Sequence, residues 1–281
     1  MERTVFKAIL LFAVLVGAAC AETQTEDSLI NYSKSAQMNY DRGMDEFADD
    51  DCSDANKYFQ VVRQHFPYSR YAALAELRLA DCSYMDGKYS EAAVAYQQFE
   101  KTHPSHIEAH NAAFRQGLSY YRMVPIDWFL VPPPWERDQA ATRDAVNTLK
   151  NFVRNYPTSP NIPWARELIA DCEQALARHE IFAAEFYRRE GKLKAASERL
   201  KAAMERYPDS ILAPEALYLL GLTYLELQRY DAAVNTFKRL VTKYPSTHQS
   251  RRAEVMLKEV DTQGRPPLPR GSDGQGDSKA N

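Results

Sequence analysis

Three histidines lie close together and are the first residues of this sequence that could do chemistry. His106 and His110 are four positions apart, so on a helix they would share one face and could bind a metal, with His103 nearby. No acidic residue or third helical ligand accompanies them at metalloprotease spacing, and the sequence contains no HExxH, no GxSxG and no Gly-rich phosphate loop. We therefore predict no metal, no cofactor and no catalytic residue, and we do not expect an enzyme.

The amino-terminal residues have the order of a secretory signal peptide. Arg3 and Lys7 precede an apolar run over residues 8–16, which is followed by small residues and then by Cys20. This run is too short to span a bilayer, which needs about 20 residues. A Cys directly after small residues resembles the lipobox of bacterial lipoproteins, so we predict a signal peptide over residues 1–20 and lipidation of Cys20. Ordinary cleavage after Ala21 is the alternative.

The composition of the 281-residue chain favours a helical protein that does not bind nucleic acid. Hydrophobic residues make up 45% of the chain, which is enough for a packed core. The chain has 35 Lys and Arg against 38 Asp and Glu, and its net charge of -3 argues against a polyanionic partner. Ala, Leu, Glu and Arg have the highest helix propensities, so a chain rich in them should contain little or no sheet.

An internal repeat decides the fold. An Ala, a large apolar residue four positions later and a Pro eight positions after that recur five times. The copies are Ala55, Phe59 and Pro67; Ala92, Tyr96 and Pro104; Ala145, Leu149 and Pro157; Ala196, Leu200 and Pro208; and Ala233, Phe237 and Pro245. Because proline biases the residue before it out of the helical region, each copy is predicted to end a helix.

Small residues stand twelve positions before four of the repeated alanines, where two helices would have to approach closely. They are Gly43, Ala80, Ala184 and Gly221. The last copy, from Leu217 to Pro245, is the fullest match to the tetratricopeptide pattern. One helical hairpin cannot bury its own apolar face, so neighbouring hairpins must stack. We predict an all-α, right-handed superhelix of about five tetratricopeptide-like hairpins.

The spacing of the prolines locates two enlarged repeats within a tetratricopeptide-repeat domain over residues 33–261. The N-terminal repeats cover about residues 36–104, and the third repeat, about 105–157, contains a Pro- and Trp-rich loop at 124–138. The fourth repeat, about 158–208, should contain a long helix, because no Gly or Pro interrupts residues 164–190. The fifth repeat covers about 209–250. Residues 21–32 are expected to be a flexible tether and 262–281 a disordered tail.

The inserted loop contains an apolar patch. Trp128, Phe129 and Trp135 lie outside the repeat core. Such a patch commonly marks a partner or membrane surface, and packing back onto the convex side of the repeats is the alternative.

Two cysteines could form a disulfide. Cys52 is expected to begin the second helix of the first repeat and Cys82 to lie late in the next helix, which runs antiparallel to it. The alternative is that Cys82, like Cys172, is a small buried hydrophobic residue.

Residues 176–210 (LARHEIFAAEFYRREGKLKAASERLKAAMERYPDS), together with residues 137–139 and 155–157, resemble the BamD family of outer-membrane lipoproteins. The resemblance extends over about residues 36–250. It implies a protein on the periplasmic face of the cell outer membrane, held there by an N-terminal lipid. It further implies that the protein binds the β-barrel assembly protein BamA and other Bam lipoproteins, and helps to deliver and insert unfolded outer-membrane proteins.

The resemblance also implies particular binding residues. Arg199 is the first candidate for a salt bridge to BamA, and Glu185, Tyr187 and Arg188 are the next. The family assigns the substrate peptide to the N-terminal repeats, where an aromatic-lined groove suits a peptide with an aromatic end. The tyrosines in that region are Tyr68, Tyr71, Tyr84 and Tyr120.

Two other functions remain open. One is a periplasmic tetratricopeptide coordinator of cell division or envelope constriction, although a simple array would keep a more regular repeat spacing than this chain does. The other is an envelope hydrolase or its activator, although no span of residues is left to hold a catalytic domain.

Overall fold

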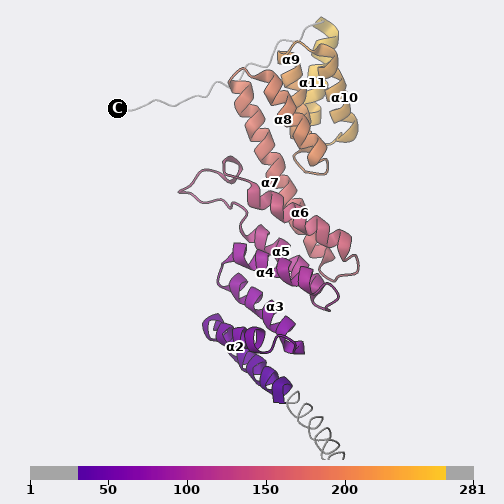
Figure 1. Cartoon of the computed structure of the whole chain (residues 1–281). Coiled ribbons are helices and arrows are strands. Elements are labelled where there is room, and N and C mark those ends of the chain that lie inside the picture. The colour runs from indigo at the N-terminus through magenta and orange to yellow at the C-terminus, as the bar shows by residue number, and fades with distance from the viewer. Residues whose placement is uncertain (1–30, 264–281) are drawn as a thin grey trace, which may run out of the picture. The chain divides into compact units, whose positions relative to one another are not determined.

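The computed structural model describes residues 31–263, and its regular elements there are helices (Figure 1). The predicted all-α class is thus confirmed, with no strand among residues 31–263. The predicted signal peptide, Cys20 and most of the predicted tail lie outside the described residues. Asn31 and Tyr32, predicted to end the tether, are already helical, and the Tyr32 ring packs edge-on against Phe66 with 5.0 Å between ring centroids.

The helices follow one another through short connections. Residues 31–48 are helical. The helices that follow are α2 (Cys52–His65), α3 (Arg70–Met85), α4 (Tyr89–Thr102), α5 (Ala109–Arg122), α6 (Ala140–Asn155), α7 (Ile162–Arg189), α8 (Leu193–Arg206), α9 (Ala213–Glu226), α10 (Tyr230–Lys243) and α11 (His248–Gln263). A single 3-10 turn, η1 (Pro134–Glu136), lies in the loop between α5 and α6. Among the described residues, no helix is long and apolar enough to cross a bilayer.

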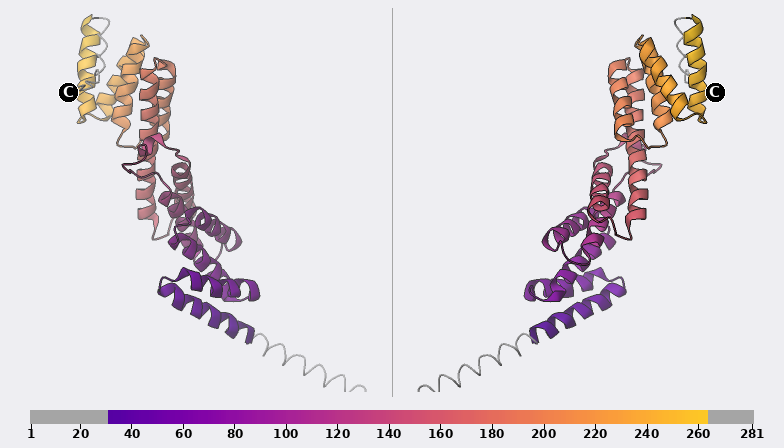
Figure 2. Two further views of the ribbon diagram at one scale, coloured as in Figure 1. Left: turned by 90° about the vertical axis from the view of Figure 1, so that its left-hand side faces the viewer. Right: turned by 90° about the vertical axis from the view of Figure 1, so that its right-hand side faces the viewer.

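The chain divides into two compact units. The described part of the first unit is residues 31–123 with 154–161, and that of the second is residues 124–153 with 162–263. The expected repeat domain over residues 33–261 therefore contains both units. In the first unit α2 packs on α3, α3 on α4 and α4 on α5. In the second unit α7 packs on α8, α8 on α9, α9 on α10 and α10 on α11, and the last three helices stay side by side in the views of Figure 2.

The repeated residues are the contacts between helices. All five repeated alanines and all five large residues that follow them are 0% exposed. All five repeats end as predicted. Helices α2, α4, α8 and α10 are each followed by an aromatic C-cap residue that directly precedes a proline, and α6 ends at Asn155, directly before Tyr156 and Pro157. At the C-caps of α2, α4, α8 and α10 the backbone lies outside the helical region, with φ from -127 to -133° and ψ from 47 to 57°.

Glycine is required where the two helices of a hairpin come closest. A Cβ on Gly43 would lie 2.7 Å from the Phe59 ring, and one on Gly221 would lie 2.3 Å from the Phe237 ring. Both rings are completely buried, so neither can move aside cheaply. The prediction of close approach at these positions is confirmed, and Ala80 and Ala184, the other two members of the set, are also 0% exposed.

In four hairpins, the residue two positions before the second helix has a positive φ angle. It is Gly87 (φ 74°), Gly191 (φ 69°), Asp50 (φ 60°) or Gln228 (φ 58°). The sequence analysis missed this feature. Glycine adopts this conformation without strain, so the two glycines were an available signal, whereas Asp50 and Gln228 show that the fold imposes it on other residues.

The two enlarged repeats have the predicted causes. Residues 124–138 contain η1 and no α-helix, and α7 is a continuous helix of 28 residues. The sequence analysis did not separate out α11, which packs Ala253, Met256, Leu257 and Val260 against the core of the second unit. The three- and four-residue spacing of these side chains is a helical pattern that could have predicted it.

The first prediction concerns Gly221. Gly221→Ala should lower the free energy of unfolding by about 1–2 kcal/mol, because overpacking against the buried Phe237 ring outweighs the helix propensity that Ala gains. Urea unfolding measures the change. In a Phe237→Leu background the same substitution should cost less, and a Gly221→Ala variant that is more stable than the parent protein would contradict the close approach.

Candidate functional site

A buried carboxylate joins α7 to α8 in the second unit. Glu180 is 7% exposed, and its oxygens accept hydrogen bonds from Arg199 at 3.1 Å and from Arg206 at 3.5 Å. A charge withdrawn from water is stable only when it is paired and hydrogen-bonded. The two arginines are seven positions apart and therefore share one face of α8.

This pairing holds Arg199 in place at the surface. Its side chain is 44% exposed although it is bonded to Glu180. The hydrogen bond to Glu180 is the main cause that raises the pKa of Arg199 above its ordinary value, and the nearby Tyr187 hydroxyl raises that pKa further. Because a guanidinium group has five N–H donors, the bond to Glu180 leaves donors for an additional acceptor.

The other three candidates from the family resemblance lie near the C-terminal end of α7. Arg188 pairs with Glu226 of α9 at 2.5 Å, and only about a fifth of each side chain is exposed, 21% and 22%. Glu185 and Tyr187 are half-buried. The structure thus brings Tyr187 together with Arg199, whereas Arg188 is bound to a different helix.

The four tyrosines proposed for a peptide groove have different environments. Tyr71 is 7% exposed and belongs to the core of the first unit, whereas Tyr68 is 95% exposed in the turn before α3. Tyr84 is half-buried and accepts a hydrogen bond from Arg122 Nε at 2.8 Å, and Tyr120 is also half-buried. Burial leaves Tyr71 little surface to offer a peptide, so a groove contact would have to come from the other three.

The outer part of the inserted loop is exposed. Trp128, Phe129 and Leu130 are 54%, 87% and 72% exposed, and the rings of Trp128 and Phe129 stack with 5.8 Å between centroids. These residues form the apolar patch that we call the loop apex.

The inner part of the same loop packs back on α7. His179 Nδ1 donates to the backbone carbonyl of Trp135 at 2.7 Å, and the Arg178 guanidinium lies 5.5 Å from the centre of the Trp135 ring. Trp135 therefore packs on α7, whereas the loop apex is exposed, and a partner or membrane surface at the apex stays a prediction.

A cleft of about 270 Å³ lies between this loop and α7. Its walls are Pro125, Pro134, Trp135, Gln139, Asp171, Gln174, Ala175 and Arg178. The Gln139 amide donates to the carbonyls of Pro134 at 2.7 Å and Arg137 at 2.9 Å. Because Gln139 and Arg178 hold the loop, the cleft follows from the way the loop packs.

The three histidines each have a different partner. His103 lies 3.0 Å from Glu76, and His110 Nδ1 lies 3.1 Å from the Ser159 hydroxyl. His106 Nδ1 accepts a hydrogen bond from the backbone N–H of Glu108 at 3.1 Å. Their ring nitrogens therefore serve local contacts.

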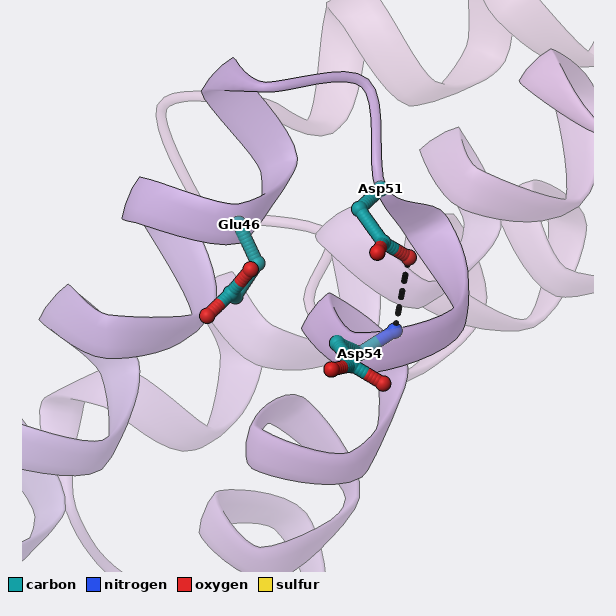
Figure 3. Close-up of side chains that lie close together, drawn as sticks. All are labelled: Glu46, Asp51 and Asp54. Atoms are coloured by element: carbon teal, nitrogen blue, oxygen red, sulfur yellow. Dashed lines mark hydrogen bonds between the residues drawn. The ribbon is translucent and has the colours of Figure 1, made fainter.

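Three carboxylates of the first unit lie near one another, as Figure 3 shows. Oxygens of Glu46, Asp51 and Asp54 are all within 4.8 Å of each other. Asp51 caps α2 by accepting a hydrogen bond from the backbone N–H of Asp54 at 3.0 Å, and the Asp54 carboxylate pairs with Lys57 at 2.5 Å. Helix capping and a surface ion pair account for two of the three groups.

A second buried carboxylate, which the sequence analysis missed, ties together three helices of the first unit. Asp81 of α3 is 1% exposed; it accepts a hydrogen bond from the Tyr96 hydroxyl of α4 at 2.7 Å and pairs with Arg78 at 2.5 Å and with Arg115 of α5. Burial raises the pKa of Tyr96, which keeps the phenol protonated as a donor. An Asp one position after the repeated small residue Ala80 was the available signal, but its partners on other helices lie 15 and 34 residues away.

The fold and these surfaces define a helical-repeat protein in which buried carboxylates pair with arginines of neighbouring helices. The chain belongs to the YfiO family of outer membrane lipoproteins, whose family model matches residues 32–233.

Two relatives and one solved structure illustrate the similarity. The outer membrane protein assembly factor BamD of Neisseria gonorrhoeae is 26% identical over 240 residues, 82% of this chain and 88% of the relative. The factor of the same name from Caulobacter vibrioides is 29% identical over 223 residues, 78% of this chain and 70% of the relative. The TPR2AB domain of yeast Sti1, solved in its complex with pHSP90, aligns with a TM-score of 0.38 and 11% identity over 80% of this chain and 85% of that one.

The second prediction separates the two parts of the inserted loop. Trp135→Ala should lower the free energy of unfolding by about 1–2 kcal/mol, because it removes half-buried apolar surface and the cation–π contact with Arg178. Phe129→Ala is the matched control and should change it by less than about 0.5 kcal/mol, since Phe129 is 87% exposed. Urea unfolding compares the two variants, and equal losses would contradict this division of the loop.

The third prediction concerns Asp81. Asp81→Ala should lower the free energy of unfolding by about 2–3 kcal/mol, because two arginines lose their partner, although both are in part exposed. Tyr96→Phe removes one hydrogen bond and should cost about 1 kcal/mol. Thermal and urea unfolding measure both losses, and a Tyr96→Phe loss larger than that of Asp81→Ala would argue against the carboxylate as the centre of the cluster.

Proposed function

We propose that this chain helps to assemble outer-membrane β-barrel proteins as a docking component of the assembly machinery. The observation that carries the proposal is the family match over residues 32–233, whose curated relatives are named outer membrane protein assembly factors. The geometry supports the proposal, because stacked helical hairpins present extended surfaces to a partner. The buried charged side chains form ion pairs that hold neighbouring helices together.

In this proposal the second unit binds BamA. Arg199 supplies a cation that is already fixed by Glu180 and is still 44% exposed, so an acidic group of the partner can bind it without first ordering a flexible side chain. Tyr187 lies beside it and adds an aromatic surface, and Glu185 is half-buried on the same part of α7. Arg188 would contribute by its bond to Glu226, which holds the end of α7 against α9.

The first unit receives the unfolded substrate. Tyr68, Tyr84 and Tyr120 keep exposed ring surface in that unit and suit a peptide with an aromatic end. Lipidation at Cys20 would hold the chain on the periplasmic face of the outer membrane, beside other Bam lipoproteins.

Affinity purification tests the proposal directly. The tagged full chain is recovered from detergent-solubilised outer membrane, and the expected result is co-purification of a large β-barrel protein at constant stoichiometry. Recovery of the chain from the soluble fraction without such a partner would reject the proposal.

The fourth prediction assigns the contact to Arg199. Arg199→Ala should lower recovery of the β-barrel partner about tenfold, because a lost charged hydrogen bond is worth about 1.5–3 kcal/mol. Arg206→Ala is the matched control, since Arg206 pairs with the same Glu180 carboxylate and sits on the same face of α8. Its recovery should change less than about twofold.

Circular dichroism of both variants shows whether α7 and α8 remain folded. Equal losses in the two variants would mean that the Glu180 pairing acts only on stability, and Arg199 would then not be the contact.

A further inference from the structure

Two of the three described cysteines lie in the same buried cluster on neighbouring helices. Cys52 is the first residue of α2 and is 4% exposed, and Cys82 lies late in α3 and is 0% exposed. The Cys52 thiol donates a hydrogen bond to the Met85 sulfur at 3.9 Å, and Met85 lies three positions after Cys82 on α3. Cys52 and Cys82 belong to the same apolar cluster of the first unit. The helices α2 and α3 pack on one another, so a bond between the two cysteines would join the first repeat to the second.

We propose that Cys52 and Cys82 form a structural disulfide that joins α2 to α3. Both are thiols in the structure. Formation in the cell rests on the proposed function for its location, because disulfides persist outside the cytoplasm.

The reaction is a thiol–disulfide exchange. The Cys52 and Cys82 S–H bonds break, one S–S bond forms, and two protons and two electrons pass to the disulfide of an oxidant, which becomes two thiols. In the cell the oxidant is a disulfide-bonded protein thiol oxidase, and in the test tube it is oxidised glutathione.

The environment of the two thiols sets when this reaction occurs. Burial is the main cause that raises the pKa of both Cys52 and Cys82, which disfavours the attacking thiolate. The folded, reduced protein should therefore oxidise slowly, and the bond forms while the chain folds and the thiols are still exposed.

The position of the pair explains what the bond contributes. Cys52 belongs to α2, which ends the first described hairpin, and Cys82 belongs to α3, which begins the next one, so the bond would hold two neighbouring repeats together. The two cysteines are thirty positions apart, and closing a segment of that length removes conformational freedom from the unfolded chain.

Cys172 is an internal control. It is 1% exposed within α7 of the second unit, and burial raises its pKa to about 12. It should remain a thiol under the same conditions.

Peptide mapping gives the fifth prediction. The reduced chain is refolded in a buffer of oxidised and reduced glutathione, quenched with acid, alkylated with N-ethylmaleimide in denaturant and digested with trypsin. We expect a linked pair of peptides, residues 43–57 and 79–88, that is two hydrogen atoms lighter than the sum of its parts, with Cys172 alkylated. Alkylation of both Cys52 and Cys82 would overturn the proposal.

A reductant comparison tests the stabilising role. Without reductant the urea midpoint of the parent chain should lie higher by about 1 M, whereas the midpoint of Cys52→Ala should not depend on reductant. Equal midpoints for the oxidised and reduced parent chain would overturn that role.

The same mapping of chain taken from cells separates this proposal from the proposed function. A linked pair that forms on refolding but is absent from cells would reject the proposed location and leave the pairing intact. A linked pair in a chain that recovers no β-barrel partner would reject the proposed function alone.

Discussion

The close approach of two helices within each hairpin is the constraint on which the rest of the structure depends. Gly43 and Gly221 lie against the buried rings of Phe59 and Phe237, with no room for a methyl group. A contact this tight allows one register between the two helices, because a shift of one residue would drive a larger side chain into the ring. The register in turn decides which charged residues of neighbouring helices meet.

Two buried carboxylates hold neighbouring helices together in a similar way. Asp81 in the first unit and Glu180 in the second each lie on the first helix of a hairpin and bind an arginine from a following helix. The arginines, Arg115 and Arg199, remain 45% and 44% exposed. Replacing such pairs with apolar residues is often neutral or stabilising, so stability alone does not account for them. In both units the arrangement presents a fixed cation at the surface.

Much of this fold could be predicted from residue type and spacing, because each repeated position has the same local role. The buried alanines, the helix ends before proline, the inserted loop and the long α7 all follow from such patterns. The partners of Asp81 on other helices, Tyr96 and Arg115, could not be predicted, since they lie 15 and 34 residues away and depend on how three helices pack. The burial of Tyr71 could not be predicted either, because an aromatic residue early in a helix can line a groove or pack in a core. Local spacing specifies the hairpins, whereas the candidate site depends on contacts between them.

In the docking role proposed above, the chain would gain from having its surface charges fixed before the partner binds. A free arginine loses about 0.5–1.5 kcal/mol of side-chain freedom on binding, and an arginine already held by a buried carboxylate has lost much of it on folding. Arg199 has further donors beyond its bond to Glu180, so binding an acidic partner need not break that bond. The free energy needed to order this contact is therefore supplied when α7 and α8 pack, and the same packing makes the geometry of the contact specific. A repeat scaffold can select its partner in this way, through the position at which the fold holds its charges.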